Sequence, residues 1–219
     1  EVAAEPFHVR TVAGDYNPRM ATSRSTPRLR LTAALLGLVV VLVSVSERDL
    51  LEGTWGQLSR LGGLALVVCA ALGRVWTSAF IAGFKDTTLV RAGPYAACRH
   101  PLYALSWIGM LGLGLASRSV VITLVLGAAF ALIFVGAIRR EDALLAQLHG
   151  DAFEAYRRAV PALWPRRFDG QLPESTELRP RVFFKSIVDA ASLFGAYLLL
   201  QLADLSQAAG VSPALLRLP

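Results

Sequence analysis

Hydrophobic residues gather in five long runs, and polar residues are confined to the segments between them. The runs cover residues 29–46, 61–84, 102–117, 119–138 and 182–202. At about 1.5 Å per residue, a helix of each run would cross most or all of a bilayer core of about 30 Å. The pattern predicts an all-α fold, a polytopic membrane helix bundle with about five transmembrane helices.

The first run has a second interpretation. It follows basic residues and ends with Ser44-Val45-Ser46, a small-residue pattern that also fits the cleavage site of a signal peptide. We prefer a first transmembrane helix, because the later runs already indicate a membrane protein. The preceding residues, 1–28, are polar and contain Pro6, Pro18 and Pro27, so they predict a loose N-terminal arm. Residues 29–219 then form one helical membrane domain, whose motif-bearing core is 70–167.

Composition supports the membrane class. Hydrophobic residues make up 54% of the chain and charged residues 17%, and the mean hydropathy is +0.50. A soluble domain of this size could not cover so much apolar surface. The net charge of +6 comes from basic residues beside the apolar runs, which favours membrane lipids over nucleic acid as the partner. Cys69 lies in an apolar run and Cys98 in a polar motif, so we expect no disulfide.

The basic residues also predict an orientation. With five spans and a cytoplasmic arm, only Arg48, Arg60, Arg118 and Arg217 of the 22 lysines and arginines lie on the outer side. Basic residues in short loops mark the cytoplasmic side of a membrane protein. We therefore expect a multi-pass integral membrane protein whose central polar motifs face the cytoplasm.

The third and fourth runs form a hairpin, because only Ser117-Arg118-Ser119 separates them. Two crossings return the chain to the side it left. The hairpin therefore brings Arg99 and His100, just before the third run, close to Glu141, just after the fourth. These residues form a candidate site at one membrane face.

The chemistry of the site follows from its residues. Pro101 suits the first position of a helix, where free N–H groups, the helix dipole and Arg99 would together attract a carboxylate or phosphate. Glu141 and Asp142 could accept hydrogen bonds from ribose hydroxyls or pair with an ammonium group. We expect Glu141 to face the His100 corner and Asp142 to point about 100° further round the helix. The combination fits a zwitterionic, sugar-bearing cofactor.

Each residue also has a structural interpretation. The arginines could be positive-inside anchors, His100 a cap, Glu141 and Asp142 helix-surface charges, and the tyrosines interface residues. Arg74 could extend to the interface, which we favour, or face a polar cavity inside the bundle. The three histidines, His8, His100 and His149, make no metal-ligand pattern with the cysteines.

Two motifs resemble a known family. They are Gly93-Pro94-Tyr95-x3-Arg99-His100-Pro101-x-Tyr103 and Glu141-Asp142-x2-Leu145-x4-Gly150-x2-Phe153-x2-Tyr156-x3-Val160-Pro161. Their order and spacing resemble the isoprenylcysteine carboxyl methyltransferase family and its phospholipid methyltransferase relatives. The resemblance implies an S-adenosylmethionine-dependent methyltransferase that takes a lipophilic small-molecule or prenylated acceptor from the bilayer.

The resemblance also assigns residues. It implies cofactor contacts at Thr87, Thr88, Leu89, Val90, Tyr95, His100, Pro101, Leu102, Tyr103 and Glu141. The family's substrate-contacting arginine, four residues before the glutamate, is Ala137 here, so Arg139 or Arg140 could replace it, or the substrate is not a prenylcysteine. His149 and Phe153 also depart from the family pattern.

Direct methyl transfer to a carboxylate, thiol or amine requires positioning more than acid–base groups. The candidate catalytic residues are therefore Arg99, Arg139 and Arg140, which could orient an anionic acceptor. Two alternatives are an NADPH-dependent enzyme of the sterol-reductase type, which shares an Arg-His-Pro-x-Tyr pattern, and a non-catalytic membrane scaffold.

Overall fold

The computed structural model describes residues 53–82, 88–165 and 180–211, with short pieces at 37, 46–47, 172, 178 and 216–217. These residues all belong to one compact unit, Gly37–Pro219. The predicted N-terminal arm, almost all of the predicted first span and Thr87 lie outside the described residues.

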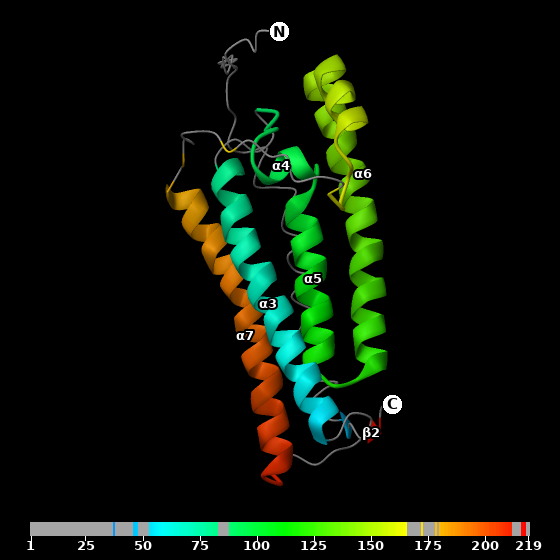
Figure 1. The fold of residues 1–219 in the computed structure, drawn as a ribbon, viewed down its shortest axis with the longest axis vertical. Helices are drawn as coiled ribbons and strands as arrows, with labels where there is room; N and C mark the ends of the chain where they lie inside the picture. The colour runs from blue at the N-terminus through cyan, green and yellow to red at the C-terminus, as the bar shows by residue number, and fades with distance from the viewer. Residues whose placement is uncertain are drawn as a thin grey trace. The chain divides into compact units, whose positions relative to one another are not determined.

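Helices dominate the described part of the chain (Figure 1). They are α3 (Gly53–Ile81), α4 (Pro94–Ala97), α5 (Pro101–Ala116), α6 (Val120–Ala159) and α7 (Pro180–Ala208). Two residues at each end of the unit, β1 (Ser46–Glu47) and β2 (Leu216–Arg217), pair in parallel. The predicted helical fold is confirmed.

The helices pack side by side, with α3 between α5 and α7, and α5 between α3 and α6 (Figure 1). At the contact of α3 with α5, a Cβ atom on Gly63 would lie 2.5 Å from the Gly112 carbonyl oxygen, and one on Gly112 would lie 2.8 Å from that of Gly63. Only glycine allows the two backbones to approach so closely. Such small-residue contacts are typical of helices that pack within membranes.

Three helices, α3, α6 and α7, are long and apolar enough to cross a membrane. They contain three of the five predicted spans. The 102–117 run forms the shorter α5, whose 16 residues are about 24 Å long. The run 29–46 lies almost wholly outside the described residues, so the total number of passes stays a prediction.

Two helices are longer than the apolar runs predict. Helix α3 begins at Gly53, eight residues before the apolar run that starts at residue 61. Helix α6 has 40 residues, which a bend at Gly150 divides into two pieces, and the first piece alone, 120–149, is about 45 Å long, well beyond the roughly 30 Å of a bilayer core. Its apolar first half ends near Ile138, so its polar second half extends beyond the membrane.

Arg74 faces the interior of the bundle. Its guanidinium donates a hydrogen bond to the Ser106 hydroxyl of α5, and Asp189 of α7 is its acidic neighbour. The interface position favoured by the sequence is therefore wrong. The bond explains how the membrane segment of α3 accommodates a cation, since buried charges in membranes need polar partners.

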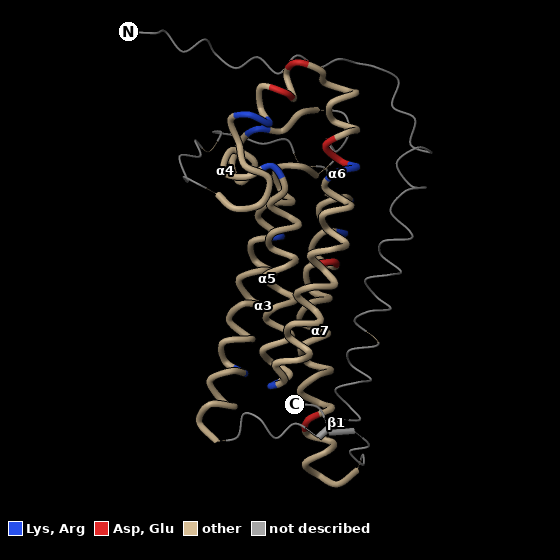
Figure 2. Tube along the Cα trace, turned by 90° about the vertical axis from the view of Figure 1, so that its right-hand side faces the viewer, with Lys and Arg blue, Asp and Glu red and all other residues tan. Residues whose placement is uncertain are grey.

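The outer surfaces of the helices are apolar. Large exposed side chains include Leu124 and Leu132 on α6 and Leu198 and Leu202 on α7. Charged residues gather towards the helix ends and on the far half of α6 (Figure 2). An exposed apolar band flanked by charges is the surface expected of a protein that lies in a bilayer.

Candidate functional site

The α5–α6 hairpin brings the two predicted polar clusters together. The turn after α5 leads directly into α6, whose first turn is capped by Ser119, since its hydroxyl accepts a hydrogen bond from Ile122 N at 3.3 Å. Helix α6 then runs antiparallel to α5, so residues 141–142 come level with the start of α5. The predicted convergence is confirmed, because side chains 42 positions apart are in direct contact.

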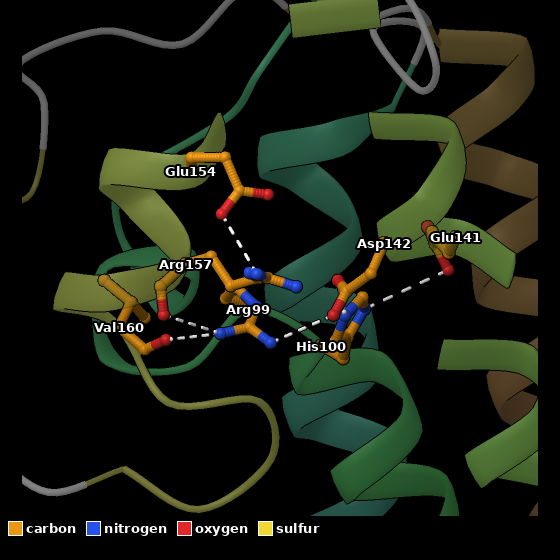
Figure 3. Close-up of polar contacts among 7 residues, drawn as sticks. All are labelled: Arg99, His100, Glu141, Asp142, Glu154, Arg157 and Val160. Atoms are coloured by element: carbon orange, nitrogen blue, oxygen red, sulfur yellow. Dashed lines mark hydrogen bonds and ion pairs between the residues drawn. The ribbon is translucent and has the colours of Figure 1, made fainter. Parts of the chain in front are cut away.

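His100 is the centre of this polar cluster (Figure 3). Its Nε2 lies 2.8 Å from Asp142 Oδ1, and its Nδ1 lies 4.0 Å from Glu141 Oε2. The imidazole is 3% exposed, whereas the two carboxylates are 17% and 18% exposed. His100 therefore lies buried between two acids, each of which keeps partial access to solvent.

The prediction that Asp142 points away from the His100 corner is wrong. Asp142 makes the closest side-chain contact with His100 and also accepts a hydrogen bond from Arg99 at 3.0 Å. The side of α6 that lies between the directions of the Glu141 and Asp142 side chains is turned towards His100. Successive side chains about 100° apart can then approach His100 from two sides. The second acid of the motif belongs to the site as much as the first.

Arg99 connects Asp142 and His100 to the C-terminal end of α6. Its guanidinium donates hydrogen bonds to the carbonyl oxygens of Arg157 at 3.0 Å and Val160 at 2.8 Å (Figure 3). The last carbonyls of a helix have no intrahelical donor, and a cation there also offsets the helix dipole. The backbone N–H groups of Arg99 and His100 donate to Pro161 and Ala162. The segment after α6 is thus attached to the start of α5.

Gly150 makes this return of the chain possible. Its φ of 49° and ψ of −126° interrupt α6, so that two helical pieces meet at a sharp bend. Residues with a Cβ avoid this region of φ, whereas glycine adopts it at little cost. The bend turns the second piece of α6 back towards the start of α5.

A second set of contacts involves Tyr95 of α4 and Tyr156 of α6. The Tyr156 hydroxyl donates to the Tyr95 carbonyl at 2.6 Å, and Arg91 lies over the Tyr156 ring at 5.7 Å. Arg91 also donates to the Ala152 carbonyl at 2.6 Å. These bonds attach the second piece of α6 to the loop before α5. Tyr156 belongs to the second sequence motif but was not among the predicted site residues.

Burial and charge shift the pKa values of several groups. Burial raises the pKa of Tyr95 well above its ordinary value, and the nearby negative charge of Glu141 raises it further, so the phenol stays protonated. Burial raises the pKa of the Cys98 thiol to about 11. Burial also disfavours the charged form of Asp142, but hydrogen bonds and charges from His100 and Arg99 outweigh it, and the pKa of Asp142 is lowered.

The other predicted residues lie on α5, on α6 and in the segment before α4. Pro101 begins α5, and the ring of Tyr103 packs against His100 at 5.8 Å and Phe134 at 5.2 Å between centroids. Thr88, Leu89, Val90 and Leu102 are half-buried. Arg139 and Arg140 are exposed on α6, directly before the two acids in the sequence. No group of three or more histidine, cysteine or acidic side chains within the described residues could hold a metal ion.

Comparison with known proteins identifies the family. A sequence model of the isoprenylcysteine carboxyl methyltransferase (ICMT) family matches residues 60–147, which contain Arg99, His100, Glu141 and Asp142. A protein-S-isoprenylcysteine O-methyltransferase of Schizosaccharomyces pombe is 37% identical over 78 residues, or 36% of this chain and 33% of that protein. The chain belongs to the ICMT family. This confirms the resemblance stated above, and members of the ICMT family are methyltransferases.

Two bacterial relatives of this ICMT-family membrane protein match over more of its length. The cobalt-zinc-cadmium resistance protein CzcN of Cupriavidus metallidurans is 37% identical over 168 residues, or 76% of this chain and 77% of the relative. The nickel-cobalt-cadmium resistance protein NccN of Alcaligenes xylosoxydans xylosoxydans is 33% identical over 196 residues, or 86% and 92%. No solved structure matches the chain.

Proposed function

We propose that this ICMT-family membrane protein transfers a methyl group from S-adenosylmethionine to a lipophilic acceptor. The observation that carries the proposal is the polar cluster of His100, Glu141, Asp142 and Arg99. Its residues come from both sequence motifs and all lie in the region matched by the family, 60–147, and the cluster is at one end of helices long enough to cross a membrane.

The donor set of this cluster fits the cofactor. Glu141 is a partly exposed carboxylate beside the buried phenol of Tyr95, whose pKa it raises. A carboxylate can accept hydrogen bonds from ribose hydroxyls or pair with an ammonium group, and aromatic rings attract a sulfonium cation. Glu141, Tyr95 and Tyr103 are the residues we expect to hold S-adenosylmethionine, together with the Thr88–Val90 strip and the 100–102 segment.

The cofactor, when bound, supplies an electrophilic methyl group on a positively charged sulfur. The protein positions the reacting groups and keeps water away from them. His100 is fixed between its two acids, and the apolar helices exclude water from the side that faces the bilayer. A carboxylate acceptor needs no proton transfer, whereas a thiol or amine must lose a proton.

The three candidate arginines differ in their surroundings. The guanidinium of Arg99 is engaged by Asp142 and by two carbonyls of α6, so we assign it a positioning role. Arg139 and Arg140 are exposed next to Glu141 and remain the candidates for orienting an anionic acceptor. The concentration of basic residues near these motifs supports a site that faces the cytoplasm.

A titration of the purified protein tests the proposal. We expect saturable calorimetric binding of S-adenosylmethionine and none of NADPH, with Glu141→Gln reducing the former. Binding of NADPH alone would favour the sterol-reductase type of enzyme, and binding of neither would favour a scaffold. Membrane extracts incubated with radiolabelled S-adenosylmethionine would then reveal the acceptor. Because the two bacterial relatives carry metal-resistance names, the extracts should come from cells grown with and without cobalt and cadmium.

A further inference from the structure

A second cluster of charges lies at the other end of the helices, where α5 turns into α6. Arg60 of α3 and Arg118 of the turn both approach the carboxylate of Asp204 on α7. The distances from their terminal nitrogens to Asp204 Oδ2 are 3.5 and 3.7 Å, and the Asp204 side chain is 6% exposed. Within the part of the chain that the structure describes, two guanidiniums therefore share one buried carboxylate.

A cavity adjoins the two arginines. Its volume is about 210 Å³, and it is lined by Arg60, Arg118, Gly53, Gly56 and Gln57. Among the described residues, none of those that line the cavity is acidic. The Nε–H of Arg118 is buried and has no hydrogen-bond acceptor within the part of the chain that the structure describes. Buried donors are almost always paired, so this one indicates a ligand that supplies an acceptor.

The start of α3 also favours an anionic ligand in this cavity. Gly53 and Gly56 belong to the first turn of α3, where backbone N–H groups have no acceptor within the helix. Glycine leaves this backbone uncovered, and the positive end of the helix dipole favours negative charge. The cavity thus combines two guanidiniums with backbone donors, and the ligand that suits both is an anion with several oxygens.

We propose that this cavity binds a phosphate group, either the headgroup of an anionic phospholipid or free phosphate. The site lies near the ends of α3, α5 and α7, where a bilayer places its headgroups, and basic pockets between membrane helices are known to bind anionic headgroups. It is separate from the His100 cluster and does not depend on the proposed methyl transfer.

Native mass spectrometry of the full chain in detergent tests the proposal, with dioleoyl phosphatidylglycerol, dioleoyl phosphatidylcholine and inorganic phosphate as probes. We expect Arg60→Gln and Arg118→Asn each to lower phosphatidylglycerol binding about tenfold, as loss of a charge-assisted hydrogen bond does. Asparagine suits position 118 because the φ there is 60°, which asparagine tolerates. Arg181→Gln, an exposed arginine at the start of α7, is the charge-matched control and should change nothing.

Asp204→Asn separates binding from a purely structural role. Removal of the shared carboxylate frees both guanidiniums, so a phosphate site should bind phosphatidylglycerol at least as tightly as before. A structural ion pair would instead lose binding together with stability. Selective binding of phosphatidylglycerol, with no competition from millimolar phosphate, identifies a lipid. Phosphate binding that Arg60→Gln abolishes identifies the free anion. Equal phosphatidylglycerol binding by the wild type and both arginine variants, or weaker binding by Asp204→Asn, would overturn the proposal.

Discussion

Asp142 Oδ1 lies 2.8 Å from His100 Nε2, although the two residues are 42 positions apart in the chain. The contact joins the start of α5 to the middle of α6 at the point where α6 leaves its apolar half. Asp142 also holds Arg99, which in turn holds the end of α6. One carboxylate thereby connects the hairpin with the segment that folds over it.

The stability of the protein should depend on the ionisation of Asp142. The pKa of Asp142 is lowered in the folded chain, because His100 and Arg99 outweigh the effect of burial. A group with a lowered pKa stabilises the fold above its unfolded pKa, which is about 3.9 for aspartate, and this stabilisation is lost as pH falls through the folded value. Thermal unfolding in detergent should therefore occur at lower temperature below about pH 4.

The variant Asp142→Asn tests the origin of this effect. It should lower the free energy of unfolding at neutral pH by about 1–3 kcal/mol, since Arg99 and His100 lose a charged partner, and it should flatten the acid dependence. Asp151→Asn, on the exposed part of α6, is the matched control. If the wild type and Asp142→Asn show the same acid dependence, other groups cause it.

Glu141 should determine cofactor affinity. Its carboxylate is partly exposed, lies 4.0 Å from His100 Nδ1 and raises the pKa of the buried Tyr95 phenol. We expect Glu141→Gln to weaken the binding of S-adenosylmethionine at least tenfold, about 1.4 kcal/mol. Calorimetry measures the affinity, and Glu154→Gln, which alters a half-exposed pair with Arg157, is the control. Similar affinities for both variants would show that Glu141 is a surface charge.

The two clusters of charge should lie on opposite faces of the membrane. Thr54 is exposed at the start of α3, and Asp151 is exposed beyond the bend of α6. In a background without the exposed Cys69, single cysteines at these positions should be labelled by a membrane-impermeant maleimide from opposite sides of sealed vesicles. Cys98 can remain, because it is buried and its thiol pKa is about 11, so it forms little reactive thiolate at neutral pH. Labelling of both positions from one side would contradict the hairpin.

Much of this arrangement was predictable because apolar run length and turn length determine a helical hairpin. The short 117–119 turn and the two runs beside it were sufficient to place Arg99 and His100 beside position 141. The helical stretch predicted over 139–159 is the second half of α6. The run lengths did not reveal that α3 begins at Gly53, since a helix that extends beyond a membrane leaves no hydropathy signal there.

Side-chain direction was the main difference between prediction and structure. A rotation of α6 by less than one residue decides whether Glu141 or Asp142 faces His100, and an apolar run does not determine that rotation. The contacts of Arg99 with Arg157 and Val160 depend on the bend at Gly150. The glycine was visible in the motif, but its conformation was not. The inward position of Arg74 depends on Ser106, whose polarity in an otherwise apolar run was the available signal.

Arg99 should control how firmly the end of α6 is held. Its guanidinium bonds to Asp142 on one side and to the carbonyls of Arg157 and Val160 on the other, at 2.8–3.0 Å. The single ammonium group of lysine cannot reproduce this fork. Arg99→Lys, like Arg99→Ala, should therefore lower the free energy of unfolding by about 1.5–3 kcal/mol. Both should also release the end of α6.

Limited trypsin digestion measures that release, because Arg157 and Arg158 are exposed and lie in the segment that Arg99 holds. We expect cleavage there to be several times faster in both Arg99 variants than in the wild type. Arg181→Ala, whose side chain lies on the exposed start of α7, should leave the rate unchanged. A direct contact of Arg99 with the cofactor would give a different result, a loss of cofactor affinity of about 1.5–3 kcal/mol in Arg99→Ala. If binding of S-adenosylmethionine weakens while the cleavage rate and the unfolding temperature do not change, Arg99 contacts the ligand, and the positioning role assigned to it is wrong.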